Sequence, residues 1–345
     1  MHALLLLCAI SVLDHTVRSA PAPSPRSTTA HGLIRGMWVW NSVSILQSPT
    51  QMNDLIVGAT AANITDLYFY MAPSSYATFT NQLQTFISQA SRARLRVWGL
   101  DGARTYLADA QGPRLFYQGI NNLIAYNSHS SPSQRFYGFQ ADIEPQDSHA
   151  DSQNLTAFHN SIPDSQLSTT AKSGVWQNTA SQDREQLMRN WLSIHESARN
   201  MLHAASLRFG AAMPFWTSTY YGEEIRVSYP DNTSPRQCVM KYMMHYVDEY
   251  VIMSYNTDPV NAAGRVETQA AYASTLPVGS MPNVFAAVEV TTGVGIYISY
   301  GDTPGKASKQ VVAADMRNIT AALTKYPAFA GVGLHMWQAW QALPA

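Results

Sequence analysis

The sequence contains little charge and few cysteines. Only 13% of its 345 residues are charged, the net charge is −1, and no cluster of basic residues stands out. Nucleic acid is therefore not an expected partner, because its recognition requires a basic surface. The two cysteines are Cys8 and Cys238. Cys8 lies in a segment that we expect to be removed, so no disulfide within the mature chain is expected, and Cys238 is expected to be buried.

Long apolar runs are also absent. Residues 3–13 are apolar but too few to span a bilayer, and no later stretch is long enough. Together with the small residue Ser19, they predict a secretory signal peptide over residues 1–19; a retained membrane anchor is the alternative. Residues 20–32 are rich in Pro, Ser and Thr and predict a linker or short pro-segment. We expect a secreted, extracellular monomer that has no membrane contact after signal removal.

Hydrophobic residues make up 46% of the chain and aromatic residues 11%, which is enough for one large core. Residues 33–345 are therefore expected to form one domain. Sequons of the type Asn-x-Ser/Thr at Asn63, Asn154 and Asn318 predict glycosylation, in agreement with secretion.

Short apolar strands alternate with helices along this domain. Eight strands are expected at Gly36–Asn41, Ile64–Met71, Leu95–Asp101, Phe136–Pro145, Leu207–Trp216, Glu249–Asn256, Asn283–Val290 and Phe329–Trp337. Helices are expected near residues 50–60, 78–93, 115–127, 184–205, 236–246, 266–275 and 309–325, with little room for a final one. Continuous apolar strands are typical of a parallel sheet that is covered on both faces. We predict an α/β fold with a single (β/α)₈ TIM barrel. A doubly wound open sheet is the alternative, but no Gly-rich turn follows the first strand.

The fourth predicted strand ends in two acids, Asp142 and Glu144, followed by Pro145. Residues two apart on a strand point to the same face, so both carboxylates are expected to lean the same way. In a TIM barrel the active site lies at the C-terminal ends of the strands. The sequence therefore predicts acid chemistry at this rim. The long connection from Gln146 to Gln182 is expected to be a functional loop or a lid.

The other predicted strand ends carry many aromatic side chains. Candidate substrate-binding residues at these ends are Trp38, Trp40, Tyr70, Trp98, Asp101, Trp216, Asn256, His335 and Trp337. Flat rings suit the apolar faces of sugars, and acids among such rings can serve as general acids. The alternative is that these rings simply fill the barrel.

Two of these segments resemble family 18 of the glycoside hydrolases, the chitinase group. Gly138–Glu144 is similar to that family's Asp-Gly-x-Asp-x-Asp-x-Glu motif on strand four, and Met253–Asn256 is similar to Met-x-Tyr-Asp on strand six. The resemblance implies that Glu144 protonates the leaving oxygen, that Asp142 orients the substrate's N-acetyl group as the nucleophile, and that Tyr255 assists. Tyr137, Gln140 and Asn256 stand where the family has Asp.

Ile143-Glu-Pro145 also partly resembles the Asn-Glu-Pro end of strand four in the large barrel clan of retaining glycosidases. This resemblance implies that Glu289, on strand seven, is the catalytic nucleophile and Glu144 the acid/base. Direct attack requires the two carboxyl groups roughly 5–5.5 Å apart. Because an unpaired buried charge is costly, Glu289 needs a partner, and a structural Arg or Lys is the alternative to a catalytic role.

A divalent cation could bind if Asp101, Asp142, Glu144, Glu289 and His335 converged. The sequence has no His-x-His or His-Glu-x-x-His spacing, so we expect neither a metal nor another cofactor. The leading hypothesis is a secreted glycoside hydrolase that cleaves a polysaccharide or glycan with retention, Glu144 being the proton donor. A non-catalytic, chitinase-like carbohydrate-binding protein is the alternative, since amides at 140 and 256 would keep hydrogen bonding without charge.

Overall fold

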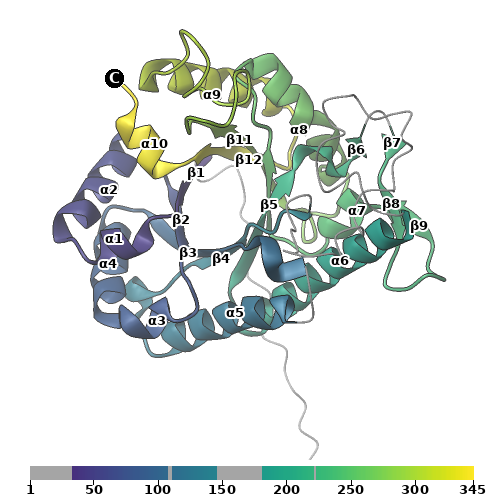
Figure 1. Ribbon diagram of the computed structural model, residues 1–345, viewed down its shortest axis with the longest axis horizontal. Coiled ribbons are helices and arrows are strands. Elements are labelled where there is room, and N and C mark those ends of the chain that lie inside the picture. The colour runs from purple at the N-terminus through teal and green to yellow at the C-terminus, as the bar shows by residue number, and fades with distance from the viewer. Residues whose placement is uncertain (1–32, 108–110, 146–180, 221–222) are drawn as a thin grey trace, which may run out of the picture.

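Eight parallel strands close into one barrel in the computed structural model, which describes residues 33–107, 111–145, 181–220 and 223–345 (Figure 1). The order of strands around the barrel is β1-β12-β11-β10-β5-β4-β3-β2. Each strand pairs in parallel with both neighbours, and the closing pair is β1 with β12. The predicted (β/α)₈ barrel is confirmed, and closure excludes the open sheet.

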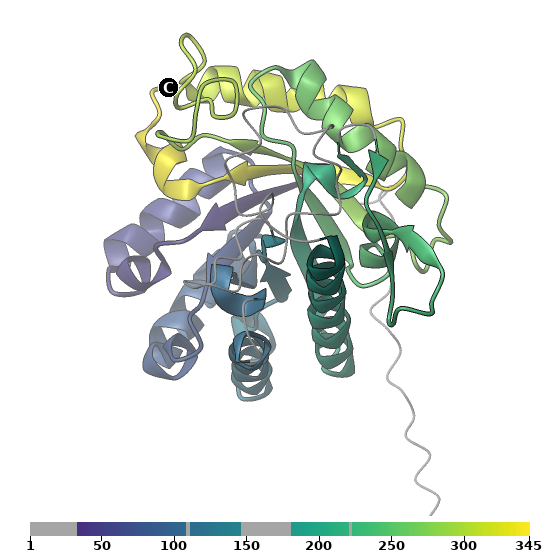
Figure 2. The same ribbon diagram turned by 45° about the vertical axis from the view of Figure 1, so that its right-hand side comes forward.

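The barrel strands are β1 (Ile34–Val39), β2 (Asp66–Tyr70), β3 (Arg96–Asp101), β4 (Gly138–Ala141), β5 (Arg208–Pro214), β10 (Glu249–Met253), β11 (Asn283–Glu289) and β12 (Phe329–His335). The helices are α1 (Ser42–Leu46), α2 (Pro49–Ala61), α3 (Ser75–Thr78), α4 (Thr80–Arg92), α5 (Gly112–Ser128), α6 (Ser181–Ala204), α7 (Val239–Met243), α8 (Pro259–Ala273), α9 (Lys309–Leu323) and α10 (Trp337–Ala342). They surround the barrel (Figure 2).

The structure corrects the prediction in two places between β5 and β11. Residues Arg236–Cys238 form strand β9, which pairs with β8 (Arg226–Ser228) in an antiparallel hairpin, so the helix expected from residue 236 begins only at Val239. Helix α8 begins seven residues before the expected Val266. The Asp258 carboxylate accepts a hydrogen bond from the Val260 amide at 2.9 Å, and Pro259 occupies the first turn, where its missing N–H costs nothing.

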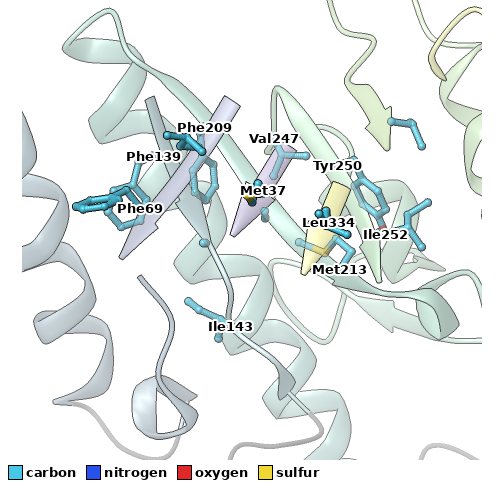
Figure 3. Packing of buried hydrophobic residues seen from close by; sticks show 14 of the residues in the cluster. Met37, Phe69, Phe139, Ile143, Phe209, Met213, Val247, Tyr250, Ile252 and Leu334 are labelled. Carbon is cyan, nitrogen blue, oxygen red and sulfur yellow. The ribbon is translucent and has the colours of Figure 1, made fainter. Parts of the chain in front are cut away.

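Hydrophobic side chains fill two separate layers. One layer lies between the strands and the helices, where Phe69, Phe139, Phe209 and Leu334 face outward from the barrel (Figure 3). The other fills the barrel itself and consists of Trp38, Tyr68, Trp98, Leu100, Ala212, Val251, Met253, Phe285, Ala287 and Ala330. This alternation along each strand explains why the sequence shows continuous apolar runs, because both faces are buried.

One irregularity interrupts the sheet between β11 and β12. Val284 is paired with Phe329, whereas Phe285 is paired with Gly331, so Ala330 is an extra residue on β12. Beyond this β-bulge the register is regular and ends with Glu289 opposite His335. Two side chains predicted as site residues are thereby placed side by side.

The expected signal peptide, the linker and nearly all of the 146–182 connection lie outside the described residues; the end of that connection, Ser181–Gln182, belongs to α6. Within the described ranges, no helix combines the length and apolarity needed to cross a bilayer. Cys238 is buried and has a free thiol, as expected.

Candidate active site

Half-buried side chains gather where the barrel strands end. They are Trp40 after β1, Tyr70 at the end of β2, Asp142 and Glu144 after β4, Tyr255 after β10 and His335 at the end of β12. Deeper in the barrel the side chains are fully buried. The change from full to partial burial marks this rim as the surface that a ligand can reach.

The end of β4 is fixed from both sides. The Asp142 amide donates to the Asp101 carbonyl of β3 at 3.0 Å, so strand pairing continues past Ala141. Ile143 is buried among the outward-facing residues, and its carbonyl accepts a hydrogen bond from the Trp191 indole of α6 at 2.9 Å. With Ile143 held outward, Asp142 and Glu144 flank it and remain half-exposed, as the alternation of the sequence predicts.

Glu289, His335 and Trp40 form a hydrogen-bonded chain across three strands. The His335 Nδ1 lies 2.7 Å from Glu289 Oε2, and the Trp40 Nε1–H donates to His335 Nε2 at 2.9 Å. An indole N–H can only donate, so His335 Nε2 must be the acceptor, and Nδ1 carries the proton that is donated to Glu289. The other carboxylate oxygen of Glu289 accepts from the Thr291 amide at 2.7 Å. Within the part of the chain that the structure describes, the side-chain partner of Glu289 is therefore His335 rather than the Arg or Lys considered from the sequence.

Tyr255 lies between this chain and the acids of β4. Its ring centroid is 6.0 Å from that of His335. Burial raises the pKa of Tyr255 well above its usual range, and the nearby Glu289, Asp142 and Glu144 carboxylates add to that effect. The Tyr255 hydroxyl thus remains protonated at neutral pH and can donate a hydrogen bond among three carboxylates.

Aromatic rings form a wall on the β1–β2 side of the rim. The rings of Trp40 and Tyr70 are 5.5 Å apart at their centroids, with an interplanar angle of 41°, and the Trp40 and His335 rings are 6.4 Å apart. Because both Trp40 and Tyr70 are only half-buried, part of each ring remains accessible. Such a wall is suited to the apolar face of a sugar ring.

Three other predicted site residues are buried rather than partly exposed at this rim. Trp38 and Trp98 are 1% and 0% exposed and belong to the barrel interior, where the Trp98 indole donates to Asp66 at 2.8 Å. Their rings fill the barrel, which is the alternative considered from the sequence. Trp216 is buried in the layer between strands and helices.

The side chains of Trp337 and Asn256 make contacts at neighbouring helices. Trp337 begins α10, and its ring packs against Gly58 of α2, where an added Cβ would lie 2.4 Å from the ring. Asn256 is half-buried, and its side-chain oxygen accepts from the Asp258 amide at 2.8 Å, directly before α8. Neither side chain joins the carboxylates around Tyr255.

Asp101 points outward from β3 rather than into the barrel. Its Oδ2 accepts a hydrogen bond from the Tyr106 hydroxyl at 2.7 Å and lies beside Gly119 of α5. Burial raises the pKa of Asp101 to about 6, although the hydrogen bond from Tyr106 acts in the opposite direction. The strand-end position of this acid suggested a site residue, but its alternation with Leu100, which faces the interior, determines the opposite orientation.

A group of buried charged residues at the N-terminal ends of the barrel strands was not predicted. The Arg96 guanidinium makes two hydrogen bonds to the Asp66 carboxylate, one of them from Nε at 2.6 Å. Nearby, the Tyr68 hydroxyl lies 3.3 Å from Glu249, which is 1% exposed. Burial, followed by the Asp66 carboxylate, raises the pKa of Glu249 well above its usual range. Charged residues at the first position of several strands were the available signal.

Gln140 of β4 is fully buried, and neither polar atom of its side-chain amide has a hydrogen-bond partner among the described residues. No set of three or more His, Cys, Asp or Glu side chains in the described part of the chain is arranged to hold a metal ion. Of the predicted glycosylation sites, Asn63 and Asn318 are exposed, and Asn154 lies outside the described residues.

No family model and no curated protein matches this chain. Among solved structures, it is similar to a chitinase from Bacteroides thetaiotaomicron (TM-score 0.48, 10% identity, covering 89% of this chain and 90% of that one). It is also similar to a chitinase from Chromobacterium violaceum ATCC 12472 (0.44, 11%, 90% and 97%) and to the exo-β-1,4-mannosidase Op5Man5 from Opitutaceae bacterium strain TAV5 (0.44, 12%, 88% and 51%). The chain thus spans about half of the mannosidase.

Proposed function

We propose that this protein is a secreted glycoside hydrolase that cleaves a glycan containing 2-acetamido sugars with retention of anomeric configuration. The observation that carries the proposal is the group of three carboxylates around the protonated Tyr255 hydroxyl, facing the half-exposed rings of Trp40 and Tyr70. A sugar stacked on these rings has its polar edge toward the acids.

Glu144 is proposed as the proton donor. It is half-exposed and stands one residue beyond the anchored Ile143, so it can reach the glycosidic oxygen of a bound sugar. Its proton moves to the leaving oxygen as the bond to the anomeric carbon breaks. In the second half of the reaction the Glu144 carboxylate takes a proton from the attacking water, which restores the acid.

The nucleophile is proposed to be the acetamido oxygen of the substrate, oriented by Asp142 and by the Tyr255 hydroxyl. Glu289 is less suited to attack the anomeric carbon. Both of its carboxylate oxygens already accept a hydrogen bond, and its side chain is only 4% exposed. We therefore assign Glu289 a positioning role: it holds the His335 ring, which in turn accepts the Trp40 indole N–H.

The test is the rate of glycan cleavage by wild type and by Glu144→Gln across a panel of polysaccharides rich in amino sugars. Loss of a general acid is expected to lower the rate about 10²–10⁴-fold. The matched control is Glu267→Gln, because Glu267 lies on the outer surface of α8 and pairs with Lys325; its rate is expected to equal that of wild type.

Substrates with different leaving groups distinguish a proton donor from a residue that supports the fold. The 2,4-dinitrophenolate of an activated glycoside leaves without protonation, so Glu144→Gln should retain most of its kcat/KM on that substrate, whereas kcat should still fall because the variant lacks the base for the second half of the reaction. An equal loss of kcat/KM on both kinds of substrate contradicts the assignment of Glu144 as proton donor. NMR of the first product anomer tests retention. Glycan binding by wild type without any cleavage would instead favour the carbohydrate-binding alternative.

A further inference from the structure

An exposed apolar segment stands beside the candidate active site. In the loop between β11 and α9, four of five successive residues carry large apolar side chains that are exposed: Val294 (43%), Ile296 (57%), Tyr297 (69%) and Ile298 (40%). Other exposed apolar residues in the described part of the chain, such as Val260 and Val278, occur singly. Scattered single residues are ordinary on a protein surface, whereas a contiguous group marks a binding surface.

The loop is rigidly built rather than loosely extended. The Asp302 carboxylate accepts hydrogen bonds from the amides of Gly293, Val294 and Gly295 at 2.8, 2.8 and 2.7 Å. Tyr297 has a φ of +66°, which is unfavourable for an aromatic residue, and its amide is held by the Thr303 hydroxyl at 3.0 Å. A segment that is ordered at this cost, with its apolar side chains in solvent, indicates that the exposed conformation itself is needed.

Backbone hydrogen bonds connect this loop directly to site residues. The Tyr297 carbonyl accepts from the Thr257 amide at 2.9 Å, two residues beyond Tyr255. The Tyr300 amide donates to the Glu289 carbonyl at 2.9 Å. Residues 294–298, the apolar tip of this loop, therefore lie on the β10–β11 side of the rim, whereas Trp40 and Tyr70 lie on the β1–β2 side. A sugar on those rings leaves the tip free to contact the next group of the substrate.

The side chains of the tip show what kind of group this is. Three of the four are branched aliphatic residues, which have no flat face for a sugar ring and no polar atom for its hydroxyls. Between Thr291 and Gly301 the loop carries no charged residue, so it offers nothing to an anionic headgroup or an acidic peptide. We propose that residues 294–298 bind an apolar aglycone, so that the substrate is a glycoside whose sugar is linked to an alkyl or acyl-chain group. This inference rests on the proposed function and specifies its substrate.

The experiment compares kcat/KM for methyl, butyl and octyl N-acetyl-β-D-glucosaminides, each below its micelle concentration. In wild type, kcat/KM should rise at least tenfold from methyl to octyl, because each covered methylene contributes about fourfold. The triple variant Ile296→Ser, Tyr297→Ser, Ile298→Ser should keep its rate on the methyl glycoside and lose the dependence on chain length. Val278→Ser is the control, since Val278 is 71% exposed and lies before β11, at the opposite end of the barrel.

Each other outcome has a separate meaning. Equal rates on methyl and octyl glycosides in wild type, or cleavage of a glycan without cleavage of any alkyl glycoside, overturn the aglycone site and leave the proposed function standing. No cleavage of any glycoside or glycan overturns the proposed function itself. Sedimentation of Glu144→Gln with neutral phosphatidylcholine vesicles, without any chain-length dependence in wild type, assigns the tip to a bilayer and overturns the inference. Thermal unfolding of the triple variant checks its fold, because its rate on the methyl glycoside must be compared with that of an intact protein.

Discussion

The interior and the rim of this barrel contain the same kinds of aromatic residue in opposite roles. In the interior, Trp38 and Trp98 are fully buried, and their rings pack against Tyr68 at centroid distances of 4.9 and 6.1 Å. At the rim, Trp40 and Tyr70 pack at 5.5 Å but remain half-exposed. A displacement of two residues along a strand thus separates a ring that stabilises the fold from a ring that can bind a ligand.

Stability should separate the two regions most strongly. Trp98→Ala removes a large buried ring and one hydrogen-bond donor to Asp66, so the free energy of unfolding should fall by about 3–5 kcal/mol. Trp40→Ala should cost roughly 1 kcal/mol, because its ring is already partly in water. Urea unfolding followed by fluorescence measures both. Equal losses for the two variants contradict the distinction between interior and rim.

Asp101 sharpens the comparison, because it ends a strand as a site residue does but faces a helix. Burial raises its pKa from 3.8 to about 6, so the folded state binds its proton more tightly than the unfolded state. The stability contributed by the protonated form is present below about pH 4 and is lost as pH rises toward 6, by an amount on the order of 3 kcal/mol. Asp101→Asn should remove this loss.

The measurement is the difference in unfolding free energy between Asp101→Asn and wild type at pH 4, 5 and 7. The difference should grow in favour of the variant up to about pH 6 and then stay constant. Parallel pH curves for the two proteins contradict the burial of a titrating Asp101. Hydrolytic activity at a fixed pH should change little, because the carboxylate faces α5.

Glu289→Gln tests whether Glu289 attacks the substrate directly or only positions the His335 ring. In the proposed role the variant disturbs the His335 ring and thereby Trp40, so KM should rise about tenfold while kcat changes little. A nucleophile would instead lose kcat by several orders of magnitude. His335→Gln should give a similar rise, and the double variant should be no worse than either one, because all three residues belong to one chain of hydrogen bonds.

The smallest effect is expected for Trp40→Phe. The ring is kept, but the donor to His335 Nε2 is lost, so KM should rise about threefold, corresponding to one modest hydrogen bond. Steady-state kinetics on one glycan are sufficient. If Trp40→Phe and Trp40→Ala have the same KM, the ring is not a platform for the sugar.

Much of the fold, and the position of two candidate site residues at the rim, could be predicted from the sequence for identifiable reasons. The apolar strands around Phe69, Phe139 and Phe209 are buried on both sides, so their pattern is continuous and easily found. Asp142 and Glu144 were predicted at the rim because a strand alternates and Pro145 ends it. The helix expected from residue 236 was wrong at its start, since Arg236–Cys238 pairs with a strand ten residues away, and pairing partners cannot be read from one segment.

Side-chain direction beyond the ends of the strands was harder to predict. Trp337 follows β12 by two residues, but α10 begins there and directs the ring to Gly58. Glu289 and His335 were each predicted as site residues, but their hydrogen bond depends on the register of β11 against β12. Forty-six residues separate the two positions, so no local pattern could show that they are partners.

The bulge at Ala330 has a consequence for how relatives of this protein can be found. On the C-terminal side of the bulge, Glu289 lies four residues after Phe285, and His335 lies four residues after Gly331. A one-residue insertion or deletion in either segment would turn Glu289 or His335 to the opposite face of the sheet. On the N-terminal side, the bulge already accommodates one unmatched residue, so insertions and deletions before Phe285 and Gly331 leave the Glu289–His335 pair unchanged. Distant homologues should therefore vary in length before Phe285 and Gly331 and keep a constant spacing after them.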